Sequence, residues 1–135
     1  MKVIESILAD AAAISAIRRD IHAHPELCFQ ENRTADVIAK ALTDWGIPVH
    51  RGLGKTGVVG IVKNGTSSRA VGLRADIDAL PMTEHNTFAH ASQHPGKMHA
   101  CGHDGHTAML LAAADQKSTR LNSSHLRLSR MPSSA

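Results

Sequence analysis

Histidine and cysteine side chains crowd into one stretch of this 135-residue sequence. Six of its ten histidines lie between Glu84 and the apolar run that begins at Thr107, and residues 99–106 (HACGHDGH) hold three of the six. Imidazole and thiolate are preferred ligands of zinc and similar divalent metals, and Cys101 and His103, two residues apart on an extended segment, can face one ion. The spacing predicts a metal site, although a Cys-x-His pair also occurs in loops that bind nothing.

The remaining three histidines of this stretch are His85, His90 and His94. They stand in a polar, irregular segment with no pattern of their own. We interpret them as solvated loop residues and assign them no role.

Two carboxylates, Asp76 and Asp78, follow a short apolar run and emerge on one side of the chain near its end. Ligand sites in α/β proteins favour the ends of strands, and a carboxylate there can orient a metal-bound imidazole. An ion pair between Arg74 and one of the two aspartates is the alternative.

A third group of chemically capable residues is the segment 18–27 (RRDIHAHPEL), which contains His22 and His24. Histidines are favourable near the negative end of a helix, and a helix C-terminus is the simplest interpretation of this segment. A catalytic role is the alternative.

Helices must position these groups. Apolar residues recur at three- and four-residue steps between residues 4 and 21, which predicts a helix that stops by His24, because Pro25 disfavours helical backbone before it. A second helix is predicted over Thr34–Trp45, with Asn32 or Thr34 as its cap and Gly46 at its end. A third should open near Asp104 and continue through residues 107–114.

Short apolar runs predict the sheet. Residues 57–62 and 70–77 are separated by a turn-like segment containing Asn64 and Gly65, so we expect an antiparallel pair, with residues 47–50 as a further short strand. The fold class is therefore α/β, with helices packed on a small mixed sheet.

Charge is unevenly distributed along the chain. The net charge is +3, but residues 117–135 hold four basic residues and no acidic one, which leaves residues 1–116 at −1. This argues against a nucleic-acid-binding protein. No apolar stretch has the length of a membrane span, and Glu5 and Asp10 interrupt the N-terminal apolar residues, so we expect a cytoplasmic protein without membrane contact.

The last residues differ in kind from the rest. Residues 117–135 (KSTRLNSSHLRLSRMPSSA) resemble the translation of a sequencing-library adapter. We therefore expect a non-native tail over 117–135 and a natural sequence in 1–116 that is cut near residues 114–116.

Three motifs together resemble the start of the M20 metallopeptidase family, in its amidohydrolase branch of hippurate hydrolases and N-acyl-amino-acid amidohydrolases. They are RRDIHAHPEL (18–27), GLRADIDALPM (72–82) and PGKMHACGHDGHTAMLL (95–111). The likeness runs from about Ile17 to Ala114. Cys28 departs from it, because this branch usually has glycine there.

The resemblance implies that residues 1–116 are the N-terminal part of a zinc-peptidase-like catalytic domain. It implies two divalent ions (Zn, Mn, Co or Ni), with Cys101 and His103 as ligands, Asp76 as support for the metal site, and Asp104 and His106 as neighbours of the metals. Arg74 stands where many members of the wider family have a ligating histidine.

The resemblance also implies an activity. The parent protein would hydrolyse the amide bond of small N-acyl amino acids, and a homodimer is one state open to it. The general-base glutamate and the remaining ligands of the family follow the third motif, so we expect the 135-residue chain itself to be inactive. The alternative is a small non-catalytic metal-binding module that uses His99, Cys101, His103 and His106.

Overall fold

Three helices and one hairpin make up the regular structure. The computed structural model describes residues 5–63 and 65–128, with the side chains of residue 6 and residues 117–128 left aside. Helix α1 (Glu5–Ala23) ends two residues before Pro25, as that proline predicts. Helix α3 (His103–Leu128) opens at the predicted place and continues into the segment 117–135. Within the described residues, no helix is both long and apolar enough to cross a membrane.

Helix α2 (Asn32–Asp44) also forms where it is predicted, but its predicted cap is wrong. Neither Asn32 nor Thr34 caps the helix. The carboxylate of Glu26 lies outside the helix and accepts hydrogen bonds from the backbone amides of Arg33 (3.0 Å) and Thr34 (2.7 Å). A carboxylate suits the positive end of a helix, so Glu26 does what a local cap would do.

Gly46 ends α2 as predicted. It has a φ of +72° and its amide donates to the carbonyl of Thr43, while the amide of Ile47 donates to the carbonyl of Leu42. A residue in the left-handed region is the usual end of a helix, and glycine adopts it without steric cost.

The predicted strand pairing is wrong. Strand β1 (Val49–Leu53) pairs antiparallel with β2 (Gly57–Gly60). The partner of residues 57–60 is therefore the strand that precedes them, not residues 70–77. Residues 70–77 form no strand, and Asn64 of the predicted turn lies outside the described residues. Alternate apolar residues of 70–77 line a cavity beside the helices. This alternation resembles that of a strand, although the segment has no hydrogen-bonded partner strand.

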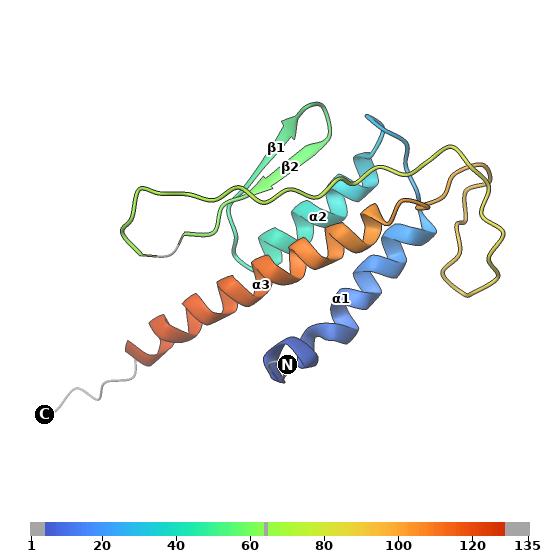
Figure 1. Cartoon of the computed structure of the whole chain (residues 1–135). Coiled ribbons are helices and arrows are strands. Elements are labelled where there is room, and N and C mark those ends of the chain that lie inside the picture. Colours follow the sequence, from blue (N-terminus) through green and yellow to red (C-terminus); the bar gives the residue numbers. More distant parts are fainter. Residues whose placement is uncertain (1–4, 64, 129–135) are drawn as a thin grey trace, which may run out of the picture.

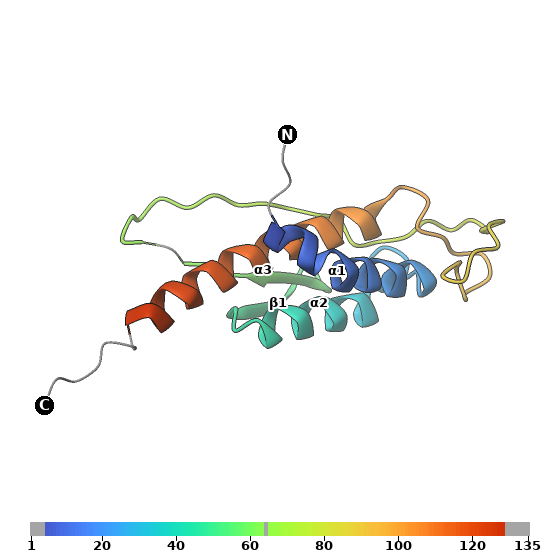
Figure 2. The same ribbon diagram turned by 90° about the horizontal axis from the view of Figure 1, so that it is seen from below.

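The layers place α3 between α1 and α2, with the hairpin on α2 (Figure 1). After β2 the chain turns back and runs past α3 toward a long loop at the end of α1 (Figures 1 and 2). A small buried core joins α2, α3 and the residue that leads into β1; its members are Ile38, Leu42, Ile47 and Leu111. The expected arrangement of helices on a small sheet is confirmed, and that sheet consists of two antiparallel strands.

Candidate metal centre

His103 is held in a defined orientation. It is the first residue of α3, and its Nδ1 lies 3.0 Å from both the backbone carbonyl and the carboxylate Oδ1 of Asp78. A ring that donates from Nδ1 to these oxygens keeps the lone pair of Nε2 free. A carboxylate or carbonyl on one nitrogen is the usual support of a metal-bound histidine, so His103 is prepared to bind a metal through Nε2.

Cys101 and His106 lie near this ring. The Cys101 thiol is free and exposed. His106 is also exposed, and its ring centroid is 5.9 Å from that of His103. Gly102 separates Cys101 from the helix with a φ of +90°, and its carbonyl accepts the amides of Gly105 and His106. The first turn of α3 therefore carries His103 and His106 together, next to an accessible thiol.

Asp76 is placed differently from Asp78. Its carboxylate pairs with the exposed Arg74 at 2.6 Å, the ion pair considered as an alternative from the sequence. Its backbone carbonyl accepts a hydrogen bond from Thr107 Oγ1 at 3.2 Å, which ties this segment to α3. In this arrangement Asp78, and not Asp76, contacts His103.

The side chains present fit part of a metal site. The free imidazole nitrogen suits zinc or nickel and the exposed thiol two residues away suits zinc, whereas manganese prefers oxygen ligands. Among the described side chains, those of residues 5, 7–63 and 65–116, however, no group of three or more His, Cys, Asp or Glu is arranged to hold one ion. A complete coordination shell would need further ligands.

A buried ionic cluster lies beside this centre, where the end of α1 meets the start of α3 (Figure 1). The Nδ1 of His22 is 2.8 Å from Asp104 Oδ2, and its Nε2 is 3.1 Å from Glu84 Oε1. Arg18 reaches the same Asp104 oxygen through Nε at 2.7 Å. The exposed fraction of the side chain is 4% for His22, 3% for Glu84 and 1% for Asp104. We call these four residues the His22 cluster.

Glu84 is strongly stabilised as a carboxylate. Burial alone would raise its pKa, but hydrogen bonds from the Asn86 side chain, the Ser92 amide and His22 outweigh that effect and lower the pKa to about 2. Glu84 therefore stays ionised at every ordinary pH and organises the loop around it.

Three buried polar atoms in or near the His22 cluster have no hydrogen-bond partner within the described part of the chain: both ring nitrogens of His99 and the Oδ1 of Asp104. Burial lowers the pKa of His99, although Asp104 acts in the opposite direction. His99 is thus a neutral ring inside the fold, and its ring centroid is 6.2 Å from that of His22.

The prediction that His85, His90 and His94 are solvated holds only in part. His85 is exposed, but His90 is half-buried and stacks on Phe88 with 4.2 Å between ring centroids. His94 is exposed and meets the ring of His24 edge-on at 5.7 Å. Partial burial and the charges of Arg19 and Arg18 lower the pKa of His90.

Sequence reasoning missed the His22 cluster. Its members come from three segments, and 82 residues separate His22 from Asp104. Residue types and local spacing carry no signal for such a pairing. The one available hint was a histidine at the end of a helix, and that position is explained equally well by the helix dipole.

Known proteins resemble this chain in sequence and structure. Residues 72–125 match the model of peptidase family M20/M25/M40. A hippurate hydrolase of Campylobacter jejuni is 47% identical over 84% of this chain, and an N-acyl-L-amino acid amidohydrolase of Geobacillus stearothermophilus is 46% identical over 84%. A Bacillus subtilis crystal structure described as a dinuclear metal binding peptidase from the M20 family superposes with a TM-score of 0.80 and 39% identity, over 84% of this chain and 32% of that one. The chain spans about 30% of the length of the two curated relatives.

Proposed function

The chain belongs to peptidase family M20/M25/M40, and from this we propose that residues 1–116 are part of the catalytic domain of a metal-dependent amidohydrolase. The proposed reaction is hydrolysis of the amide bond of small N-acyl amino acids, on the ground that two relatives are named for hippurate and N-acyl-L-amino acids. The observation that carries the proposal is the ring of His103, held at Nδ1 by Asp78 and two residues from the exposed Cys101.

Cys101 and His103 are the residues that would hold one of two divalent ions. When bound, such ions lower the pKa of a water molecule and polarise the carbonyl of the amide. The protein residues set the geometry: Asp78 orients His103, and Asp104 anchors the first turn of α3 in the interior. His106 would line the site beside the metals. The resemblance gives Asp76 a supporting role, and its backbone carbonyl accepts a hydrogen bond from Thr107 of α3.

We propose that the 135-residue chain by itself does not hydrolyse these substrates. The described residues include no group of three or more ligands, which supports this view. We further propose that residues 117–135 are non-native, that the parent protein is cytoplasmic and that it forms homodimers. The two free thiols, Cys28 and Cys101, are compatible with a reducing compartment.

Titration of the chain with Co²⁺ tests the metal site directly. A thiolate bound to Co²⁺ produces a charge-transfer absorption that needs no catalytic activity. We expect this band in the unaltered chain, and we expect Cys101→Ser to abolish it and His103→Gln to weaken affinity by about 100-fold or more. Cys28→Ser is the matched control for the thiol and His85→Gln for the imidazole, since both control residues are exposed.

The outcome separates the proposal from its alternative. A band that survives Cys101→Ser would contradict the proposed ligand. Tight uptake of one ion by the chain would favour the non-catalytic binding module, whereas weak binding is expected of a partial shell. Metal-dependent hydrolysis of an N-acyl amino acid by the purified chain would refute its proposed inactivity.

The same titration compares the two aspartates. We expect Asp78→Asn to weaken Co²⁺ binding by about 10- to 100-fold, the usual cost of losing a partner of a ligating histidine. Asp76→Asn should have a smaller effect on this ion, because its carboxylate contacts Arg74 instead. Equal effects of the two substitutions would show that the contact with His103 is not what matters.

A further inference from the structure

His22 connects the metal-binding segment to a loop on the opposite side of its ring. We propose that His22 is a positioning residue, which fixes the start of α3 and thereby the affinity of Cys101 and His103 for a divalent ion. This inference rests on the proposed function of that pair. It concerns a residue of α1 that lies outside the candidate ligand set and is hydrogen-bonded to Asp104 and Glu84, not to Cys101 or His103.

A buried carboxylate anchors the start of α3. Asp104 directly follows His103, and its side chain is only 1% exposed. Its Oδ2 lies 2.8 Å from Nδ1 of His22 and 2.7 Å from Nε of Arg18. A helix whose first turn is fixed by a buried, charge-assisted contact has little freedom to rotate or shift. His103 belongs to the same turn, so the contacts of Asp104 also fix the position of the His103 ring.

His22 also contacts the loop formed by residues 80–98. Residues 80–98 leave and return at a pair of backbone hydrogen bonds between Leu80 and Met98, of 2.9 and 3.0 Å. The loop is flanked by Asp78, the partner of His103, and by His99, which leads to Cys101. Glu84 accepts the Ser92 amide inside this loop and meets His22 Nε2 outside it. His22 therefore ties the two chain segments that bracket the site to one point on α1.

Orientation can be separated from charge in this cluster. Arg18 also pairs with Asp104, so the carboxylate keeps a cationic partner when His22 is replaced. Any loss of metal affinity in a His22 variant then reflects a change in position more than an unpaired buried charge.

Three substitutions of His22 test the inference. The amide nitrogen of asparagine reaches the position of Nδ1, and that of glutamine reaches the position of Nε2. His22→Asn should therefore keep the donor to Asp104, while His22→Gln keeps the donor to Glu84 and His22→Ala keeps neither. We expect Co²⁺ affinity to fall about tenfold or more in His22→Ala and His22→Gln, and to fall by less in His22→Asn, which loses only the contact with the loop.

A core variant provides the control. Ile38→Val removes a methylene from the buried core, which does not include Arg18, His22 or Asp104, and so destabilises the chain without removing a contact of the His22 cluster. Unfolding in urea is measured for every variant. Loss of Co²⁺ affinity in Ile38→Val equal to that in His22→Gln would overturn the inference, because stability alone would then explain it.

The failures are distinguishable. If the unaltered chain shows no thiolate–cobalt band, the proposed function fails and the positioning role fails with it. If the band is present and all His22 variants bind Co²⁺ equally, only the positioning role is wrong. If His22→Ala does not fold, the contrast between His22→Asn and His22→Gln decides, and equal affinities in that pair overturn the inference.

Discussion

Glu84 makes the stability of the fold depend on pH. Its folded-state pKa of about 2 lies below its ordinary value of 4.5, so the stabilisation is complete above about pH 4.5 and is lost as the pH falls toward 2. We expect Glu84→Gln to lower the free energy of unfolding by about 1 to 3 kcal/mol at pH 7 and by less at pH 3. Urea unfolding at the two pH values measures both differences.

The exposed Glu5 supplies the control for this prediction, since Glu5→Gln removes the same charge from a solvated position. A destabilisation by Glu84→Gln that is equal at pH 7 and pH 3 would mean that the lost contacts of Glu84 do not depend on its charge.

At the residue scale, residue types point to metal-binding chemistry, but they do not say which side chains contact one another. Cys101 and His103 stand out because thiolate and imidazole are preferred ligands of zinc, although a Cys-x-His pair alone does not require a metal. Asp76 and Asp78 have the same type and lie on the same side of an extended chain, so nothing local decides which of them reaches His103. Backbone placement decides it, and that placement depends on α3.

At the scale of elements, Glu26 stabilises α2 from outside the helix. We expect Glu26→Ala to cost about 1 to 2 kcal/mol of unfolding free energy, the upper range for a lost helix cap, because two amides of the first turn lose their acceptor. Asn32→Ala is the control, since the Asn32 side chain is exposed and bonds only to the carbonyl of Gln30. Thermal or urea unfolding measures both, and equal costs would contradict the role of Glu26.

The helices could be predicted and the strand pairing could not. A helix satisfies its backbone within its own sequence, so periodicity and a residue such as Gly46 are sufficient to locate it. A strand needs a neighbour. Residues 57–60 had two candidate neighbours of similar pattern, and the turn between Leu53 and Gly57 brings the nearer one into register.

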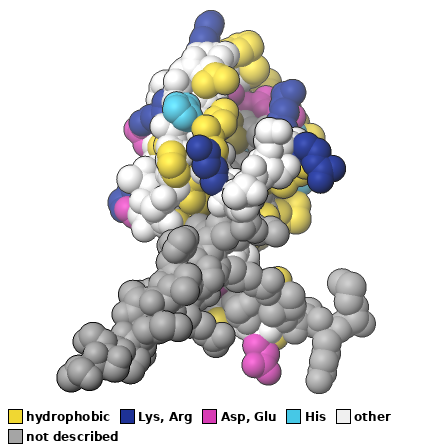
Figure 3. Space-filling model, turned by 90° about the vertical axis from the view of Figure 1, so that its left-hand side faces the viewer, with side chains coloured by type: hydrophobic (Ala, Val, Ile, Leu, Met, Phe, Trp, Pro, Cys, Tyr) yellow, Lys and Arg dark blue, Asp and Glu magenta, His cyan; other side chains and the backbone are white. Residues whose placement is uncertain are grey.

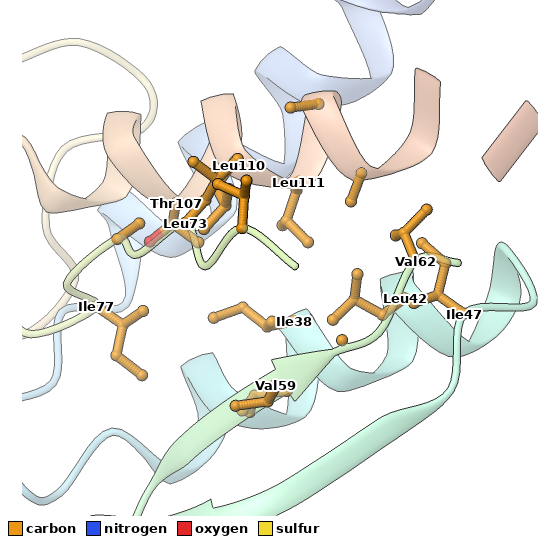
Figure 4. A pocket seen from close by; sticks show the side chains of 16 residues that line it. Ile38, Leu42, Ile47, Val59, Val62, Leu73, Ile77, Thr107, Leu110 and Leu111 are labelled. Carbon is orange, nitrogen blue, oxygen red and sulfur yellow. The ribbon is translucent and has the colours of Figure 1, made fainter. Parts of the chain in front are cut away.

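At the scale of the whole molecule, apolar surface remains uncovered. Residues 70–77 and β2 line an apolar cavity of about 360 Å³ against α2 and α3 (Figure 4). Val71 and Leu73 belong to this lining and are 87% and 71% exposed. Hydrophobic side chains also appear between charged ones on the face shown in Figure 3. Exposed apolar surface next to unpaired backbone favours association.

We therefore expect the chain to associate with rising concentration and to bind the dye ANS. The double substitution Val71→Lys and Leu73→Lys should reduce the light-scattering mass at a given concentration and lower the ANS fluorescence. The double substitution Thr66→Lys and Ser68→Lys, at exposed positions outside the cavity lining, is the matched change of charge. Unchanged association in the Val71→Lys and Leu73→Lys double variant would show that a different surface mediates self-association.

The hydrogen-bonded pair Leu80 and Met98 has a consequence for engineering. Because two backbone hydrogen bonds, with N–O distances of 2.9 and 3.0 Å, join Leu80 to Met98, the tip of the loop can be lengthened, shortened or labelled while its two ends stay paired. Residues around His85 are exposed and lie between Glu84 and the half-buried His90. A peptide inserted there would be connected through the hydrogen-bonded base of the loop. That base separates the insertion from Asp78 on one side and from Cys101 on the other.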